Sequence, residues 1–147
     1  MRIRYKLHLS ASASEVFDLL HDYSRRPSWD PVMADSVLIG AQVARKGAVV
    51  RCRDRLGFTM DTVYSGFRRP YSASVRMTTG PWPFSRLGGC WRLKPAGPRD
   101  CQLFITYNIK TTPRLARIVI EPFVCAVFYL QTVRRMRALQ RHLSKIK

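Results

Sequence analysis

The chain has 147 residues, of which 46% are hydrophobic and 24% are charged. These proportions are typical of a globular protein, and they exclude a collagen, a coiled coil and an intrinsically disordered chain. The charge is unusual, because 26 Lys and Arg residues face 9 Asp and Glu residues, which gives a formal net charge of +17. Such an excess attracts polyanions such as nucleic acid or anionic lipid, but it does not specify a fold.

The length predicts one domain over residues 1–147, because two independent cores would be cramped in it. The four cysteines, at positions 52, 90, 101 and 125, form no Cys-x-x-Cys pair. The N-terminal segment lacks the apolar stretch of a signal peptide, and the longest apolar run, 118–130, is too short to span a membrane. We therefore expect a cytoplasmic protein with reduced thiols and no cofactor.

The first part of the chain predicts a strand followed by short helices. Residues 2–9 alternate between apolar and polar side chains, the pattern of a half-buried strand. Ser12 and Glu15 have the spacing of a capping box, which predicts a helix from there to about residue 23. Pro27 and Pro31 then enclose one short helical turn.

In the rest of the chain, the spacing of apolar residues changes its period once. Alternation with period two predicts six further strands, near 35–42, 47–54, 57–66, 71–79, 85–94 and 101–110. After Thr112 the period becomes 3.6, which predicts a helix over 113–145 with Pro113 at its first position and a kink at Pro122. The expected core stripe of that helix is Phe123, Ala126, Val127, Leu130, Val133, Met136, Leu139 and Leu143.

This order of elements predicts an α+β fold. Short links between successive strands favour a seven-stranded antiparallel sheet, with one or two short helices after the first strand. Antiparallel sheets of this size curl, so we expect the sheet to wrap around the long C-terminal helix. The space between a curved sheet and a single helix is a common place for a ligand cavity.

Two segments of the chain resemble a known superfamily. Residues 11–20 (Ala-Ser-Ala-Ser-Glu-Val-Phe-Asp-Leu-Leu), followed by Asp22 and by Trp29-Asp30-Pro31, resemble the opening of START-like helix-grip proteins, which include polyketide cyclases/dehydrases and lipid-transport proteins. Gly80-Pro81-Trp82-Pro83-Phe84 and residues 87–93 (Leu-Gly-Gly-Cys-Trp-Arg-Leu) resemble the coenzyme Q-binding and polyketide cyclase branches in particular. The resemblance implies a helix-grip fold with a hydrophobic pocket, but it does not specify the ligand.

The inward alternation of the predicted strands indicates which residues line that pocket. We expect it to hold a lipid, a quinone or a polyketide-like aromatic molecule, for transport or sequestration, with Trp29 near one mouth. The other predicted lining residues are Val50, Met60, Tyr64, Val75, Trp91, Leu103, Ile105, Tyr107, Phe123 and Val127.

The sequence leaves catalysis open. It contains no familiar catalytic motif and no recognisable set of metal ligands. If the protein is a polyketide aromatase/cyclase, the candidates for proton transfer are His21, Tyr64 and Tyr107. Asp18 and Asp22 beside His21 lie on the polar side of the predicted helix, so the simpler interpretation places His21 at the surface.

The C-terminal helix carries a basic cluster, Arg134, Arg135, Arg137 and Arg141, without an acidic residue among them. The cluster predicts weak contact with anionic membrane or nucleic acid; the alternative is a solvated helix face. Apolar residues nearer the start of the helix exceed one core stripe, which leaves a homodimer or a lipid contact open. A basic protein acting on RNA, the ribosome or a membrane is therefore the third functional interpretation, beside the carrier and the cyclase.

Overall fold

The computed structural model describes residues 1–112 and 114–145. Its strands form one seven-stranded antiparallel sheet in the order β1-β7-β6-β5-β4-β3-β2. Each strand from β2 to β7 pairs with its neighbour in sequence, and β1 pairs with β7, so the predicted meander is confirmed. The strands are β1 (Arg2–Leu9), β2 (Met33–Ile39), β3 (Val49–Asp54), β4 (Thr59–Arg68), β5 (Ser72–Thr79), β6 (Phe84–Gly97) and β7 (Asp100–Thr111).

The helices follow the predicted order. α1 (Ala13–Leu20) and α2 (Arg26–Trp29) come after β1, and η1 (Arg114–Ala116) precedes α3 (Arg117–Lys145). Ser12 caps α1 by accepting a hydrogen bond from the Glu15 amide at 3.2 Å. Pro113, the predicted first helical residue, lies outside the described residues. No helix within 1–112 and 114–145 combines the length and hydrophobicity needed to cross a bilayer.

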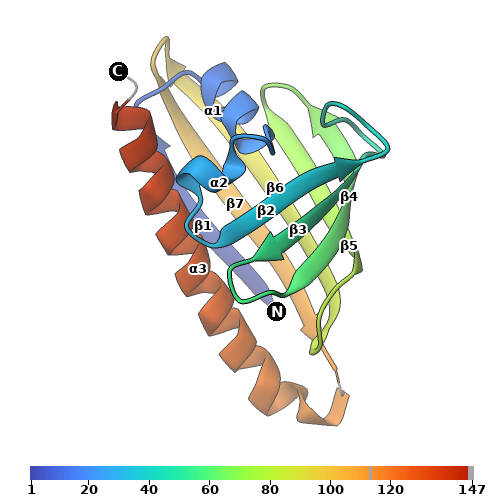
Figure 1. Cartoon of the computed structure of the whole chain (residues 1–147). Helices are drawn as coiled ribbons and strands as arrows, with labels where there is room; N and C mark the ends of the chain where they lie inside the picture. Colours follow the sequence, from blue (N-terminus) through green and yellow to red (C-terminus); the bar gives the residue numbers. More distant parts are fainter. Residues whose placement is uncertain (113, 146–147) are drawn as a thin grey trace.

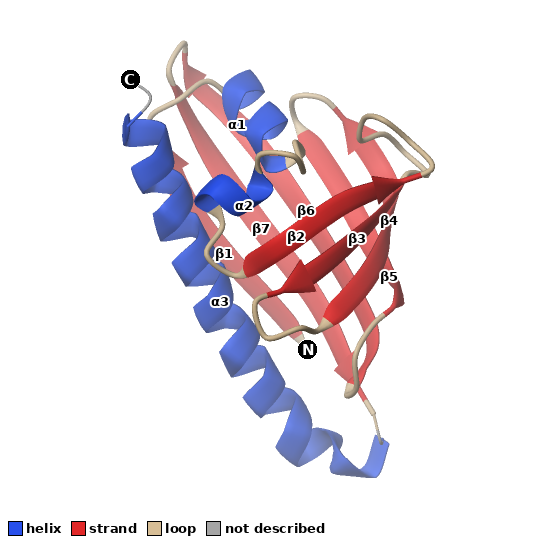
Figure 2. Ribbon diagram, viewed as in Figure 1, coloured by secondary structure: helices blue, strands red, loops and turns tan. Residues whose placement is uncertain are grey.

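The sheet curves so that β2 and β3 lie in front of β6 and β7, with α1 and α2 over one end of the concave side (Figures 1 and 2). α3 packs along β1 and β7 and also contacts α2. The side-chain amide of Gln140 donates a hydrogen bond to the His8 carbonyl at 3.0 Å, which ties α3 to β1. The predicted α+β class, with a curved sheet and a long C-terminal helix, is therefore confirmed.

One strand differs from the sequence-based expectation. β6 continues through Pro95, which pairs with Cys101 of β7, so the hairpin turn is tighter than the predicted break at 95–98. The expected bend of the C-terminal helix is present: α3 continues through Pro122, and its first turns bend away from the axis of the remainder (Figure 1).

The predicted core stripe of α3 is wrong in the first half of the helix. Phe123 is 72% exposed and Leu130 is 66% exposed. The buried positions of α3 are Cys125, Thr132, Met136, Leu139 and Leu143. Thr132 is compatible with burial because its hydroxyl donates to the Phe128 carbonyl at 2.9 Å. Apolar residues surround the first half of α3, so the apolar pattern does not distinguish the face that packs on the sheet.

This assignment of faces predicts that replacing two leucines of α3 by alanine changes the free energy of unfolding by different amounts. Leu139 is fully buried, so Leu139→Ala should lower the free energy of unfolding by about 2–5 kcal/mol through lost burial and a residual cavity. Leu130→Ala, the matched control, should change it by less than about 0.5 kcal/mol. Urea denaturation followed by circular dichroism measures both, and equal losses would contradict the assignment.

Candidate functional site

A cavity of about 320 Å³ lies between the sheet and α3, with α2 near one end. Its rim is apolar and exposed: Leu56 and Phe58 come from the β3–β4 turn, Trp82 from the β5–β6 loop and Phe123 from α3. The cavity follows α3 from Phe123 to Arg135, a distance of about 18 Å at 1.5 Å per residue. Its volume and apolar lining are those of a site for a small organic molecule.

The cavity includes about half of the residues predicted to line it. Met60, Val75, Trp91, Tyr107, Phe123 and Val127 border the cavity. The other predicted residues are buried in the surrounding core instead: Trp29, Val50, Tyr64, Leu103 and Ile105. Alternation along a strand identifies the concave face of the sheet, but it does not show which part of that face the helices cover.

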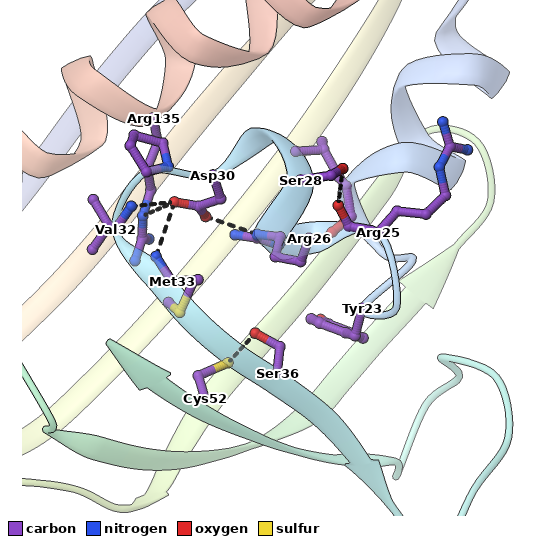
Figure 3. Close-up of polar contacts among 12 residues, drawn as sticks. Tyr23, Arg25, Arg26, Ser28, Asp30, Val32, Met33, Ser36, Cys52 and Arg135 are labelled. Atoms are coloured by element: carbon purple, nitrogen blue, oxygen red, sulfur yellow. Dashed lines mark hydrogen bonds and ion pairs between the residues drawn. The ribbon is translucent and has the colours of Figure 1, made fainter. Parts of the chain in front are cut away.

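The inner end of the cavity is polar, in contrast to the rim. Arg26 and Arg135 line it, and both contact the fully buried carboxylate of Asp30. Arg26 Nε donates to Asp30 Oδ2 at 2.9 Å, and Arg135 Nε lies 3.4 Å from Asp30 Oδ1. Figure 3 shows Asp30 between the two guanidinium groups. Two positive charges therefore share one negative charge.

Asp30 is saturated with donors. Its Oδ1 also accepts hydrogen bonds from the amides of Val32 at 2.9 Å and Met33 at 3.3 Å. Burial by itself raises the pKa of Asp30, but the charges of Arg135 and Arg26 outweigh it and hold the pKa below the usual value of 3.8. Asp30 is therefore ionised at neutral pH and has little capacity for a further donor.

Arg26 and Arg135 differ in how many of their hydrogen-bond donors have partners within the protein. Arg26 Nη1 donates to the Leu20 carbonyl at 2.8 Å, and its guanidinium lies 5.0 Å from the ring centre of Trp29. Arg135 Nε is buried and makes no hydrogen bond within the described part of the chain. Because Nε faces Asp30, the donors with capacity to bind a ligand oxygen are the two Nη groups of Arg135, which make no hydrogen bond to the described residues.

The prediction that Arg135 belongs to an exposed basic cluster is therefore wrong. Its side chain is only 11% exposed and lines the cavity, whereas Arg134, Arg137 and Arg141 are exposed on the outer side of α3. Neighbouring positions on a helix point in directions about 100° apart, so consecutive arginines cannot share one face.

The interpretation of His21 as a surface residue is also wrong. Its imidazole is buried, with Nδ1 2.7 Å from the hydroxyl of Tyr64, while Nε2 has no partner within the described residues. The Tyr64 hydroxyl is also hydrogen-bonded to that of Tyr23, which borders the cavity. Two predicted catalytic candidates therefore meet outside the cavity, and Tyr23, which the sequence analysis missed, connects them to it.

Burial shifts the pKa values of these groups strongly. It lowers the pKa of His21 to about 3, with an added contribution from the nearby charge of Arg26. It raises the pKa of Tyr23 to about 12, and it raises those of Tyr64 and Tyr107 as well. At neutral pH the imidazole is uncharged and the tyrosines are protonated, so the phenols act as hydrogen-bond donors or acceptors.

The third candidate, Tyr107, lies on the cavity wall apart from His21 and Tyr64. Gly89 pairs with Tyr107 across β6 and β7, and a Cβ atom at Gly89 would come within 3.0 Å of Tyr107 Cε1. The glycine therefore allows the Tyr107 ring to lie against β6, where it contacts Trp91 with ring centres 6.1 Å apart. Among residues 1–112 and 114–145, no cluster of three His, Cys, Asp or Glu side chains is placed to hold a metal ion.

Comparison with known proteins now gives the family. Residues 1–144 match the family described as polyketide cyclase / dehydrase and lipid transport. The chain belongs to this family. No match is found among curated protein sequences. The predicted membership of the START-like helix-grip superfamily is thereby confirmed.

Solved structures agree with the fold. A START superfamily protein from Mycobacterium smegmatis superposes with a TM-score of 0.84 at 13% identity, over 99% of each chain. The ZhuI aromatase/cyclase of Streptomyces sp. R1128 gives 0.80 at 19% identity, over 99% of this chain and 94% of that one. Norcoclaurine synthase from Thalictrum flavum gives 0.73 at 13% identity, also over 99% and 94%. At these identities the likeness shows the fold, and not the reaction or the ligand.

The buried imidazole predicts a stability that depends on pH. The unfolded chain binds a proton at His21 below about pH 6.5, whereas the folded chain does so only near pH 3. Between these pH values the unfolded state binds more protons than the folded state. The free energy of unfolding should therefore fall by up to about 1.4 kcal/mol for each unit by which the pH is lowered.

Denaturation of a His21→Asn variant measures this effect, because the Asn amide oxygen preserves an acceptor for Tyr64. At pH values above the range in which carboxylates titrate, the free energy of unfolding of this variant should depend much less on pH than that of the wild-type protein. His8→Asn, at an exposed position of β1, is the control and should keep the slope. A slope unchanged in His21→Asn would show that His21 is not the group responsible.

Proposed function

We propose that the protein binds, without covalent chemistry, an amphipathic small molecule that has an apolar body and one anionic oxygen group. The observation that carries the proposal is Arg135, a guanidinium with unused hydrogen-bonding capacity at the inner end of an apolar cavity. The family, whose description includes lipid transport, supports a hydrophobic ligand.

The walls of the cavity favour the apolar body. Phe84, Trp91, Val127 and Phe128 line it, and Phe128 also packs edge-on against Tyr107 with ring centres 4.8 Å apart. Burying a ligand against such walls contributes roughly 25 cal/mol per Å² before the entropic costs of binding. The cavity is preformed, so little of this gain is lost to rearrangement.

The charges at the inner end favour an anionic group. Asp30 neutralises one of the two arginines, which leaves one unbalanced positive charge in a buried site. A carboxylate or enolate satisfies Arg135 with charge-assisted hydrogen bonds, and the planar guanidinium suits a carboxylate held by two parallel bonds. Tyr23 and Tyr107, protonated at neutral pH, also line the cavity and can hydrogen-bond to polar groups of a ligand. Fatty acids and acidic polyketides both have this combination of groups.

The ionisation states in the cavity favour binding over catalysis. Its tyrosines keep their protons at neutral pH, and His21 lies outside it. The carboxylate of Asp54, at the rim, accepts hydrogen bonds from the amides of Leu56 and Phe58. The protonated tyrosines supply hydrogen bonds to a ligand rather than a base near pH 7.

Fluorescent probes of different charge test this proposal. Both anilinonaphthalene sulfonate, which is anionic, and N-phenylnaphthylamine, which is neutral, should bind. Arg135→Gln should weaken the anionic probe about tenfold and leave the neutral probe within about twofold, because one charged hydrogen bond contributes roughly 1.5–3 kcal/mol. Trp91→Ala should weaken both probes, because it removes part of the shared apolar wall.

Two controls make the result interpretable. Arg134→Gln, one residue away on the outer side of α3, should change neither affinity. Melting temperatures show whether Arg135→Gln still folds, and Arg135→Lys keeps the charge if it does not. Equal weakening of both probes by Arg135→Gln, or none, would contradict the role of Arg135.

A second candidate function, a polyketide aromatase/cyclase, is favoured by one observation. Tyr23 borders the cavity and begins the hydrogen-bonded series Tyr23, Tyr64 and His21, which ends at an imidazole nitrogen without a partner. Such a series can hold the Tyr23 hydroxyl in place to donate a hydrogen bond to a substrate oxygen during cyclisation. Co-expression with a minimal polyketide synthase tests it: a cyclase should change the cyclised products, and Tyr23→Phe should abolish the change. An unchanged product pattern with the wild-type protein rejects this function.

A further inference from the structure

The outward side of α3 carries one continuous stripe, which we call the outer stripe. Its members follow each other at spacings of three or four residues, all of them are exposed, and they cover about 33 Å along the helix. The first four are apolar and the last three are arginines: Val119, Phe123, Ala126, Leu130, Arg134, Arg137 and Arg141.

The apolar half of the outer stripe continues into the rim of the cavity. Phe123 belongs to both, and the rim adds the exposed side chains of Leu56, Phe58 and Trp82, the last of them 70% exposed. Figure 1 places the β3–β4 turn, the β5–β6 loop and the first half of α3 at the same end of the molecule. A connected apolar surface of this kind on a soluble fold indicates an interaction site.

The charge distribution indicates what covers this surface. From residue 114 to the end of the sequence Glu121 is the only acidic residue, and its side chain is largely buried near the terminal amine of Met1. A second copy of the chain would bring another +17 and a second row of arginines to the contact. An anionic lipid surface instead offers phosphates to the arginines and an apolar interior to the other half.

We propose that the outer stripe and the adjoining rim dock onto a membrane that contains anionic lipids. The apolar half of the stripe enters the boundary between headgroups and acyl chains, to a depth of about 5–10 Å, and the arginines remain among the headgroups. The mouth of the cavity then opens at the membrane surface. This proposal goes beyond the function proposed above, and its test does not depend on a ligand in the cavity.

Flotation with lipid vesicles tests the docking. The wild-type protein should bind vesicles of phosphatidylcholine mixed with phosphatidylglycerol, and bind pure phosphatidylcholine much less. Phe123→Ser with Leu130→Ser should reduce binding to the mixed vesicles at least about tenfold, because two exposed apolar anchors are lost. The matched control is Val43→Ser with Tyr71→Ser, which removes two other exposed apolar side chains, 68% and 54% exposed, and should bind normally.

The arginines are tested separately. Changing Arg134, Arg137 and Arg141 together to Gln should reduce binding to the mixed vesicles to the level seen with pure phosphatidylcholine, without a change in melting temperature. High salt should weaken vesicle binding by the wild-type protein, because salt screens the attraction between the arginines and the anionic headgroups.

Three results would overturn the proposal. Normal vesicle binding by the Phe123→Ser and Leu130→Ser variant would mean that net charge alone attracts the protein. A wild-type dimer in light scattering that this variant dissociates would mean that a second copy covers the outer stripe. Binding to single-stranded RNA at physiological salt, without binding to the mixed vesicles, would assign the arginines to nucleic acid.

Discussion

The buried carboxylate of Asp30 is the contact on which the rest of the site depends. It lies at the end of α2, receives the amides that begin β2, and contacts Arg26 of α2 and Arg135 of α3. One group therefore joins three elements around the inner end of the cavity. Breaking a buried ion pair by removing one partner typically costs about 3–5 kcal/mol, and here loss of Asp30 would leave two buried cations. The same carboxylate thus sets both the shape and the charge of the site.

The geometry of one helix connects the cavity to the outer surface. Val124, Phe128, Gln131 and Arg135 face the cavity, while the outer stripe lies about 100° around the same turns and shares Phe123 with the rim of the cavity. Along both sides the helix is apolar near its start and basic near its end. A molecule with an apolar body and an anionic group would therefore meet similar chemistry at the surface and inside the cavity.

The sequence predicts the architecture well because each strand and the long helix have a clear local periodicity of apolar residues. Alternation with period two identifies each strand of the meander, and the single change to period 3.6 identifies α3. The direction of individual side chains is harder to predict where neighbouring residues are all apolar or all basic. Phe123 and Leu130 are as apolar as the buried Met136 and Leu139, so only the position of the sheet distinguishes them.

The candidate site depends on contacts between residues far apart in the sequence. Arg135 stands in a run of basic residues, and nothing local indicates that it turns inward to Asp30, more than a hundred residues earlier. His21 stands beside two aspartates, which suggested exposure, yet it packs under Tyr64 from β4. The spacing of Arg26 and Asp30, four residues apart on a short helix, was the available local signal, and it indicates half of the ionic cluster.

The central claim is that Arg135 binds the anionic group of a ligand whose body lies against Trp91. Nuclear magnetic resonance of the nitrogen-bound protons tests it most directly, with the Nε signal of Arg135 assigned by its loss in Arg135→Gln. Decanoate should shift both the Arg135 Nε signal and the indole signal of Trp91, whereas decanol, which has no charge, should shift Trp91 alone. Decanoate that shifts Trp91 but leaves Arg135 unmoved, or that moves only the exposed arginines of the outer stripe, would contradict this account of the site.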